Sequence, residues 1–180
     1  MKKSSHTFKF LPNPRIRKLA KNNPDILIDA ELYPLIPIKL YNGTKETRVI
    51  EGLIDTGADK CLIPRGFADY LELENLGDER ASGINGVSIH YRTKVGLKIG
   101  RGGRISDIGY VEAAYPDQLQ DQPILLGRTP LLDEFKLIVE KYRGRFHLIP
   151  KEETENFEDN KKPSNRKTNI KKSKKKSRRR

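Results

Sequence analysis

The sequence has little of the chemistry that many functional sites need. Its 180 residues include one cysteine, Cys61, and three histidines that lie far apart. A single thiol excludes an internal disulfide and a zinc site built from several cysteines, and the histidines lack the spacing of metal ligands. No segment has the glycine pattern of a phosphate loop or of a dinucleotide-binding turn. We therefore expect neither a metal nor an organic cofactor.

Long apolar runs are also absent. No stretch approaches the roughly 18 apolar residues that a membrane-spanning helix needs. Lys2 and Lys3 are not followed by an apolar segment of signal-peptide length. The sequence therefore predicts no membrane span and a cytoplasmic location. In a nucleated cell, the basic run at the C-terminal end could also act as a nuclear address.

Positive charge is in excess, but it lies at the two ends of the chain. Lysine and arginine number 36 against 24 acidic residues, for a net charge of +12. Residues 161–180 hold twelve of these bases and no acid, so the rest of the chain sums to zero. Residues 1–21 hold seven more bases and no acid, which leaves residues 22–160 mildly acidic. The basic character therefore says little about any active site.

Three segments differ in composition. Residues 1–24 are basic and contain three prolines, so we expect an extended arm with one short helical turn near Arg15–Lys21. Residues 25–150 hold nearly all the aliphatic side chains, enough for one hydrophobic core. Residues 151–180 have too few apolar groups to offset the entropy of ordering, and we expect a disordered tail.

The dominant hydrophobic period in the central segment is two, which is typical of half-buried strands. Turn signals such as Asn42-Gly43 and Arg143-Gly144 separate short strands. Two short helices are expected, near Gly66–Leu73 and over Thr129–Phe135, where Pro130 suits a first helical turn. Many short strands, regular turns and a helix near the C-terminal end favour a mostly β, single-lobe barrel.

The sharpest feature is the segment Leu53-Ile54-Asp55-Thr56-Gly57-Ala58-Asp59. Asp55 directly follows an apolar strand and lies in a turn that glycine closes. A carboxylate buried alone here would be costly, because desolvation disfavours its charged form. An aspartate in a turn often bonds its own backbone, and a three-residue match occurs by chance, so this segment alone also fits an ordinary turn.

Two further segments give this motif a context. About 70 residues downstream, Ile124-Leu125-Leu126-Gly127-Arg128 precedes the expected helix, and a glycine-flanked hairpin lies in between. This order of strand, Asp-Thr-Gly-Ala-Asp, hairpin, Leu-Leu-Gly-Arg, helix and terminal hairpin resembles the retropepsin-like (retroviral-type) aspartic proteases. The resemblance covers roughly residues 30–150. It implies an acid-protease β barrel with a flap, and a homodimeric aspartic endopeptidase acting on protein or peptide substrates.

A dimer is required by the number of carboxylates. The chain holds one Asp-Thr-Gly and is too short for two lobes, so a catalytic pair needs Asp55 from each of two copies. As in known aspartic-protease dyads, two carboxylates about 3 Å apart repel by roughly 5–6 kcal/mol at an effective dielectric near 20, so they share one proton. The ionised member would activate a water and the protonated member would donate to the peptide carbonyl. An acidic to mildly acidic optimum is expected.

The resemblance also assigns roles to the residues around the catalytic aspartate. Thr56 matches the residue whose hydroxyl joins the two active-site loops, and Gly57 matches a glycine whose carbonyl holds substrate backbone. Ala58 follows the motif as a small apolar residue of the substrate site. Asp59 matches a substrate-binding aspartate that pairs with Arg128. From the residues alone, Thr56 could also be an ordinary turn threonine, and the two charges could be unconnected.

The hairpin between the two motifs resembles the flap that closes over substrate in this family. Its tip reads Gly83-Ile84-Asn85-Gly86, in which the glycines allow the backbone to bend and move. In short retroviral enzymes the chain ends interleave to hold the dimer. This chain has long basic extensions at both ends, so the sequence leaves the mode of dimerisation open.

The basic tail supports a second interpretation of the whole chain. Residues 161–180 could bind nucleic acid or another polyanion through counterion release, although the tail could also be merely solubilising. The alternative to an enzyme is therefore a catalytically weak, protease-like dimer module that holds a polyanion through its tail. The joint presence of Asp55, Thr56, Gly57 and Arg128 favours the enzyme.

Overall fold

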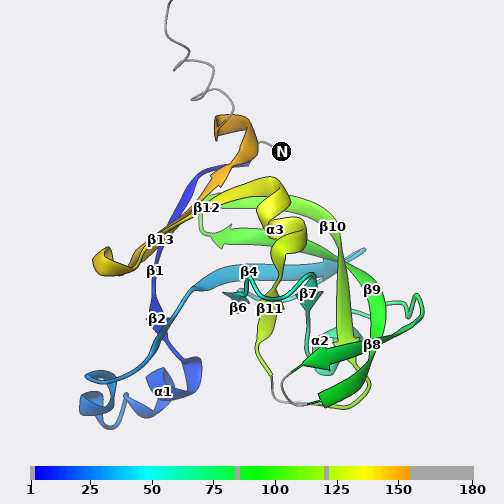
Figure 1. The fold of residues 1–180 in the computed structure, drawn as a ribbon, viewed down its shortest axis with the longest axis horizontal. Coiled ribbons are helices and arrows are strands. Elements are labelled where there is room, and N and C mark those ends of the chain that lie inside the picture. Colours follow the sequence, from blue (N-terminus) through cyan, green and yellow to red (C-terminus); the bar gives the residue numbers. More distant parts are fainter. Residues whose placement is uncertain (1–2, 84–85, 120–121, 155–180) are drawn as a thin grey trace, which may run out of the picture.

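The body of the molecule is a β barrel of six strands, which are labelled in Figure 1. The computed structural model describes residues 3–83, 86–119 and 122–154; the expected flap tip at Ile84 and Asn85 and the basic tail lie outside these ranges. Each strand of the barrel is hydrogen-bonded to the next one around it, and the pairing between the first and last strands of the spatial order given next closes the ring. In that order the strands are β4 (Leu35–Asn42), β6 (Ile50–Ile54), β11 (Ile124–Leu126), β7 (Cys61–Leu62), β10 (Arg104–Pro116) and β9 (Gly86–Arg101).

Short elements extend the barrel. β5 (Lys45–Glu46) pairs with β4, and β8 (Asp78–Gly83) pairs with the first half of β9. α2 (Arg65–Tyr70) and α3 (Arg128–Glu134) lie near the positions expected from the sequence. In α3 the backbone of Thr129 is not helical, so the helical turn begins after it. The expectation of a mostly β barrel with a short helix near the C-terminal end is confirmed.

Alternation along the strands builds the core. In β4, the side chains of Ile36, Ile38 and Leu40 are at most 1% exposed, while the residues between them are half-buried. Successive side chains of a strand point to opposite faces, so this period of two places one face of each strand inside the barrel. Other strands and α3 add to the same core cluster, notably through Val95, Leu97, Ile99, Leu126 and Leu131.

A second, three-stranded sheet joins the two ends of the described chain. β1 (His6–Lys9) pairs antiparallel with β13 (Arg145–Pro150), which pairs with β12 (Phe135–Glu140) through the turn that contains η2 (Lys141–Arg143). Phe146 and Leu148 of β13 are fully buried. The hairpin of β12 and β13 was expected, whereas its pairing with the N-terminal strand was not.

The remainder of the N-terminal segment is a pair of short strands around two short helices. β2 (Leu11–Pro12) pairs with β3 (Leu32–Tyr33), and α1 (Pro14–Leu19) and η1 (Pro24–Leu27) lie between them along the chain. Asn13 caps α1, because its side-chain oxygen accepts a hydrogen bond from the Arg15 amide at 2.9 Å. This helix lies close to the helical turn expected at Arg15–Lys21.

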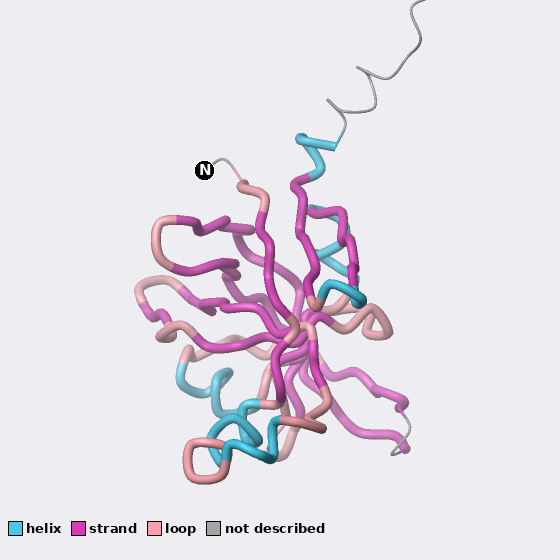
Figure 2. Tube along the Cα trace, turned by 90° about the vertical axis from the view of Figure 1, so that its left-hand side faces the viewer, coloured by secondary structure: helices cyan, strands magenta, loops and turns pink. Residues whose placement is uncertain are grey.

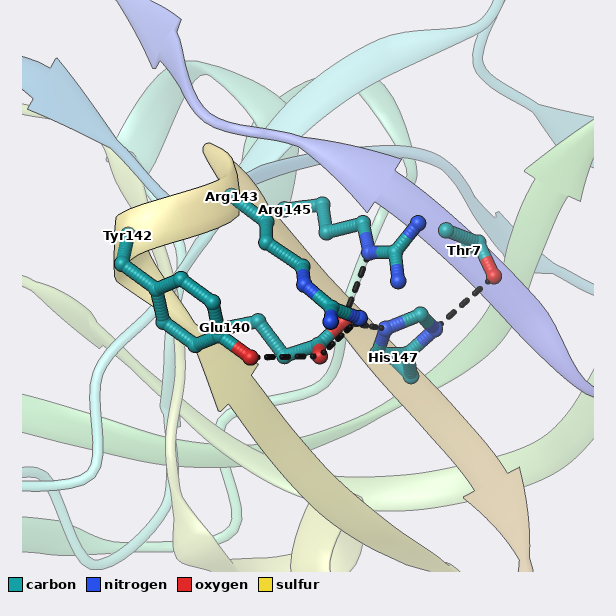
Figure 3. Close-up of polar contacts among 6 residues, drawn as sticks. All are labelled: Thr7, Glu140, Tyr142, Arg143, Arg145 and His147. Atoms are coloured by element: carbon teal, nitrogen blue, oxygen red, sulfur yellow. Dashed lines mark hydrogen bonds and ion pairs between the residues drawn. The ribbon is translucent and has the colours of Figure 1, made fainter.

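A single carboxylate connects the strands of the second sheet (Figure 3). Glu140, at the end of β12, accepts hydrogen bonds from Arg145 Nε at 2.6 Å, Arg143 Nη1 at 3.0 Å and His147 Nε2 at 2.9 Å. The other ring nitrogen of His147 is 2.9 Å from the hydroxyl of Thr7 on β1. These donors, His147 first and Arg145 next, lower the pKa of Glu140 to about 2.

Candidate active site

The Asp55 loop is held between two strands that it joins. Residues 55–60 connect β6 to β7, and β11 lies between these strands, parallel to β6 and antiparallel to β7. The loop must therefore pass over the end of β11. The Asp55 amide donates to the carbonyl of Leu126, the last residue of β11, at 3.0 Å. Asp55 is thus fixed where a buried strand leaves the barrel.

The turn itself is an Asx turn. The Asp55 Oδ1 accepts a hydrogen bond from the Gly57 amide at 2.9 Å, and the Asp55 carbonyl accepts one from the Ala58 amide at 3.2 Å. The ordinary local role of a turn aspartate is therefore present. Asp55 and Ala58 are half-buried, while Thr56 and Gly57 are exposed. The tip of the turn is open to solvent or to a partner.

The Leu-Leu-Gly-Arg segment supports the loop from behind. A Cβ atom added to Gly127 would lie 2.3 Å from the carbonyl oxygen of Lys60, so only glycine allows this approach. Two backbone bonds follow directly: the Arg128 amide donates to the Ala58 carbonyl at 2.8 Å, and the Thr129 amide donates to the Asp59 carbonyl at 2.9 Å. The two motifs that lie far apart in sequence are packed together.

An ion pair links the same two segments through their side chains. Arg128 Nη2 contacts Asp59 Oδ1, and both side chains are more than half exposed. The structure therefore brings the predicted pair together. An ion pair this exposed contributes little to stability, because water screens it. The Asp59 carboxylate is held in place by Arg128, yet it stays accessible to a ligand.

The expected flap is a hairpin that projects from the barrel (Figure 2). It consists of β8 and the start of β9, with Gly83 opposite Gly86 next to the tip. At its base, Glu79 on β8 forms an ion pair with Lys60 of the Asp55 loop at 2.6 Å. Burial lowers the pKa of His90, which faces Glu79 across the strands; the Glu79 charge opposes this shift and the Lys60 charge adds to it.

The Lys60–Glu79 contact was not expected from the sequence. Two opposite charges that lie 19 residues apart form no local pattern, and their contact depends on how the β8–β9 hairpin lies against the loop. The contact joins the hairpin to the loop.

Cys61 belongs to the core and not to the site's chemistry. It begins β7, its side chain is buried, and burial raises the pKa of its thiol to about 11. A thiol in this state carries almost no reactive thiolate at neutral pH.

Within the ranges that the structure describes, no group of three His, Cys, Asp or Glu side chains could hold a metal ion. No helix of the described residues is long and apolar enough to cross a membrane.

Comparison with known proteins gives a likeness of fold. No protein-family model and no curated protein match the chain. A retropepsin-like aspartic protease from Rickettsia conorii is similar with a TM-score of 0.45 and 15% identity, covering 82% of this chain and 94% of that one. EIAV protease in complex with the inhibitor HBY-793 is similar with a TM-score of 0.42 and 21% identity, covering 62% of this chain and 97% of that one. These likenesses concern the fold alone.

Proposed function

We propose that the chain is an aspartic endopeptidase that hydrolyses peptide bonds as a homodimer, with Asp55 of each subunit in the catalytic pair. The observation that carries this proposal is the setting of Asp55. Its backbone is bonded to the end of a buried strand, and the turn after it is open to solvent. A carboxylate on a rigid support and at an accessible surface is what proton transfer to and from a water requires.

The reaction follows from the pairing of two such carboxylates. Repulsion between the two charges makes one proton shared between them the favoured state. The ionised Asp55 takes a proton from a bound water, whose oxygen then bonds to the peptide carbonyl carbon. The Asp55 of the other subunit donates its proton to the carbonyl oxygen. Collapse of this intermediate breaks the C–N bond: the Asp55 that took the proton from water gives it to the leaving amine, and the other Asp55 takes a proton from a hydroxyl of the intermediate, which restores the shared proton.

The neighbouring residues suit the supporting roles. The hydroxyl of Thr56 has no hydrogen-bond partner among the described residues of its own chain, so it is free to bond to the loop of a second subunit. Gly57 offers its carbonyl and Ala58 its small apolar side chain to a substrate, and Asp59 offers a carboxylate that Arg128 orients. The β8–β9 hairpin would then cover the bound peptide, with its position set by the Lys60–Glu79 contact.

The test compares Asp55→Asn with Asp25→Asn, which changes an exposed aspartate outside the loop. Both variants and the unaltered chain are incubated with a mixed peptide library between about pH 4 and 7. We expect cleavage by the unaltered chain and by Asp25→Asn, loss of at least about a thousandfold in Asp55→Asn, and inhibition by a pepstatin-type compound. Sedimentation establishes whether each sample is dimeric. A dimeric chain that cleaves no peptide would overturn the proposal and favour the polyanion-binding dimer.

A further inference from the structure

A groove runs along the N-terminal strand, on the part of the molecule where the barrel meets the second sheet. It has a volume of about 430 Å³ and is lined by all four residues of β1, His6 to Lys9. Successive side chains of a strand point to opposite faces, so a groove that touches four residues in a row follows the strand's edge. No residue of β12 or β13 lines the groove. It therefore lies along the edge of β1 that faces away from β13.

Among the residues that the structure describes, no strand pairs with that edge. The order of the second sheet is β1, β13, β12, so β1 has a strand neighbour on one side only among the described residues. Every second residue of an edge strand directs its N–H and C=O away from the sheet, and these groups can pair with another extended chain. The opposite wall of the groove belongs to the barrel, through Leu35 and Pro37 of β4 and the adjoining ends of β9 and β10.

Three exposed cations line the groove. Lys9, Arg101 and Arg104 line it and are exposed, and none of them forms an ion pair or hydrogen bond with another described side chain. The one acidic residue of the lining, Glu51, is already paired with Arg17. Burial, and then the positive charge of Arg104, lower the pKa of His6. The groove thus has a surplus of positive charge.

Apolar side chains complete the wall of the groove. They come from three strands and comprise Phe8, Leu11, Leu35 and Pro37. An extended peptide with alternating acidic and apolar residues would therefore meet cations with one set of its side chains and an apolar surface with the other. A nucleic acid would use the cations but would leave the unpaired strand edge without a partner.

We propose that this groove binds an extended acidic peptide, which adds to the second sheet as a further strand beside β1. Main-chain hydrogen bonds to the free edge would supply most of the affinity, and Lys9, Arg101 and Arg104 would select acidic side chains. The groove touches β6 at Glu51 and includes no residue of the loop 55–60. The proposal does not depend on the proposed peptidase activity.

The experiment uses the full chain, labelled with ¹⁵N, and the hexapeptide Glu-Val-Glu-Val-Glu-Val at about 0.15 M salt, where long-range attraction is screened. We expect amide shifts at residues 6–9, and slower hydrogen exchange for alternate amides of β1, because alternate residues face the free edge. The peptide Gln-Val-Gln-Val-Gln-Val should bind at least about tenfold more weakly. Absence of protection in β1 would overturn the proposal.

Charge reversal separates the groove from the basic tail. The double variant Arg101→Glu and Arg104→Glu should weaken binding of the acidic peptide about tenfold. Arg48→Glu with Lys94→Glu makes the same change in net charge at exposed positions outside the groove, and should leave binding unchanged. Lys9→Glu alone provides a second groove variant if the double variant is poorly folded. Equal losses in groove and control variants would overturn the proposal, as would an RNA oligonucleotide that displaces the peptide from β1.

Discussion

At the scale of single residues, Gly127 is the position on which the site's construction depends most. Its backbone angles, φ −73° and ψ 179°, are open to any residue, so its requirement for glycine comes from contact and not from backbone strain. Gly127→Ala would place a methyl group 2.3 Å from the Lys60 carbonyl oxygen. We expect a loss of about 1–3 kcal/mol in the free energy of unfolding, measured in urea, together with displacement of the Asp55 loop.

Gly66 provides the matched control for that substitution. It lies in α2, and a Cβ atom added there meets nothing within 4 Å. Gly66→Ala should therefore stabilise the chain by about 0.5–1 kcal/mol, since alanine loses less entropy than glycine in a helix. If Gly127→Ala were as stable as the unaltered chain, the close contact between Gly127 and the Lys60 backbone would be refuted.

These residues also show what local sequence can reveal about a site. Three residues of the site follow short-range rules and could be selected before any fold was known. Asp55 is a turn aspartate, Gly57 is a turn glycine, and Gly127 is a glycine that ends a buried strand. Lys60 and Glu79 could not be selected in this way, because their contact depends on how a distant hairpin lies against the loop. The sequence predicts positions that carry a constraint of their own more readily than contacts that the fold creates.

At the scale of elements, the Glu140 carboxylate links β12 to β13 within the three-stranded sheet. Its pKa is lowered from about 4.5 in the unfolded chain to about 2 in the folded one by hydrogen bonds from His147 and Arg145. A lowered folded-state pKa contributes stability above the unfolded value, and that contribution is lost as the pH falls toward 2. Glu140→Gln should therefore lower the unfolding temperature at pH 7, and the difference from the unaltered chain should shrink below about pH 4.5.

Glu112→Gln is the control for this pH dependence. Glu112 is exposed on β10 and has no ion pair among the described side chains. Its substitution should leave the unfolding temperature nearly unchanged across the same pH range. A Glu140→Gln effect that stayed constant from pH 7 down to pH 3 would show that the carboxylate's charge does not hold the sheet together.

The same sheet marks the limit of prediction for elements. The hairpin of β12 and β13 could be expected because Arg143-Gly144 is a local turn signal, and Gly144 indeed has the left-handed backbone angle φ 63°. The pairing of β1 with β13 brings His6 opposite Leu148, and no local pattern encodes a register over that separation. Proline and charge in the first residues indicated an extended arm, but they did not indicate its partner.

At the scale of the whole molecule, one chain supplies one Asp55, so activity should depend on assembly. If the peptidase is a homodimer, its specific activity falls on dilution below the dissociation constant of the dimer.

Thr56→Val should raise the dissociation constant of the dimer about tenfold or more, because two-fold symmetry removes two hydrogen bonds at once. Thr44→Val, which changes an exposed threonine in the β4–β5 turn, should leave it unchanged. Sedimentation and activity, measured over the same dilution series, should give the same midpoint. Activity that stayed constant per chain while the protein dissociated would place a complete catalytic centre within one subunit, which a single Asp55 could not supply through a dyad.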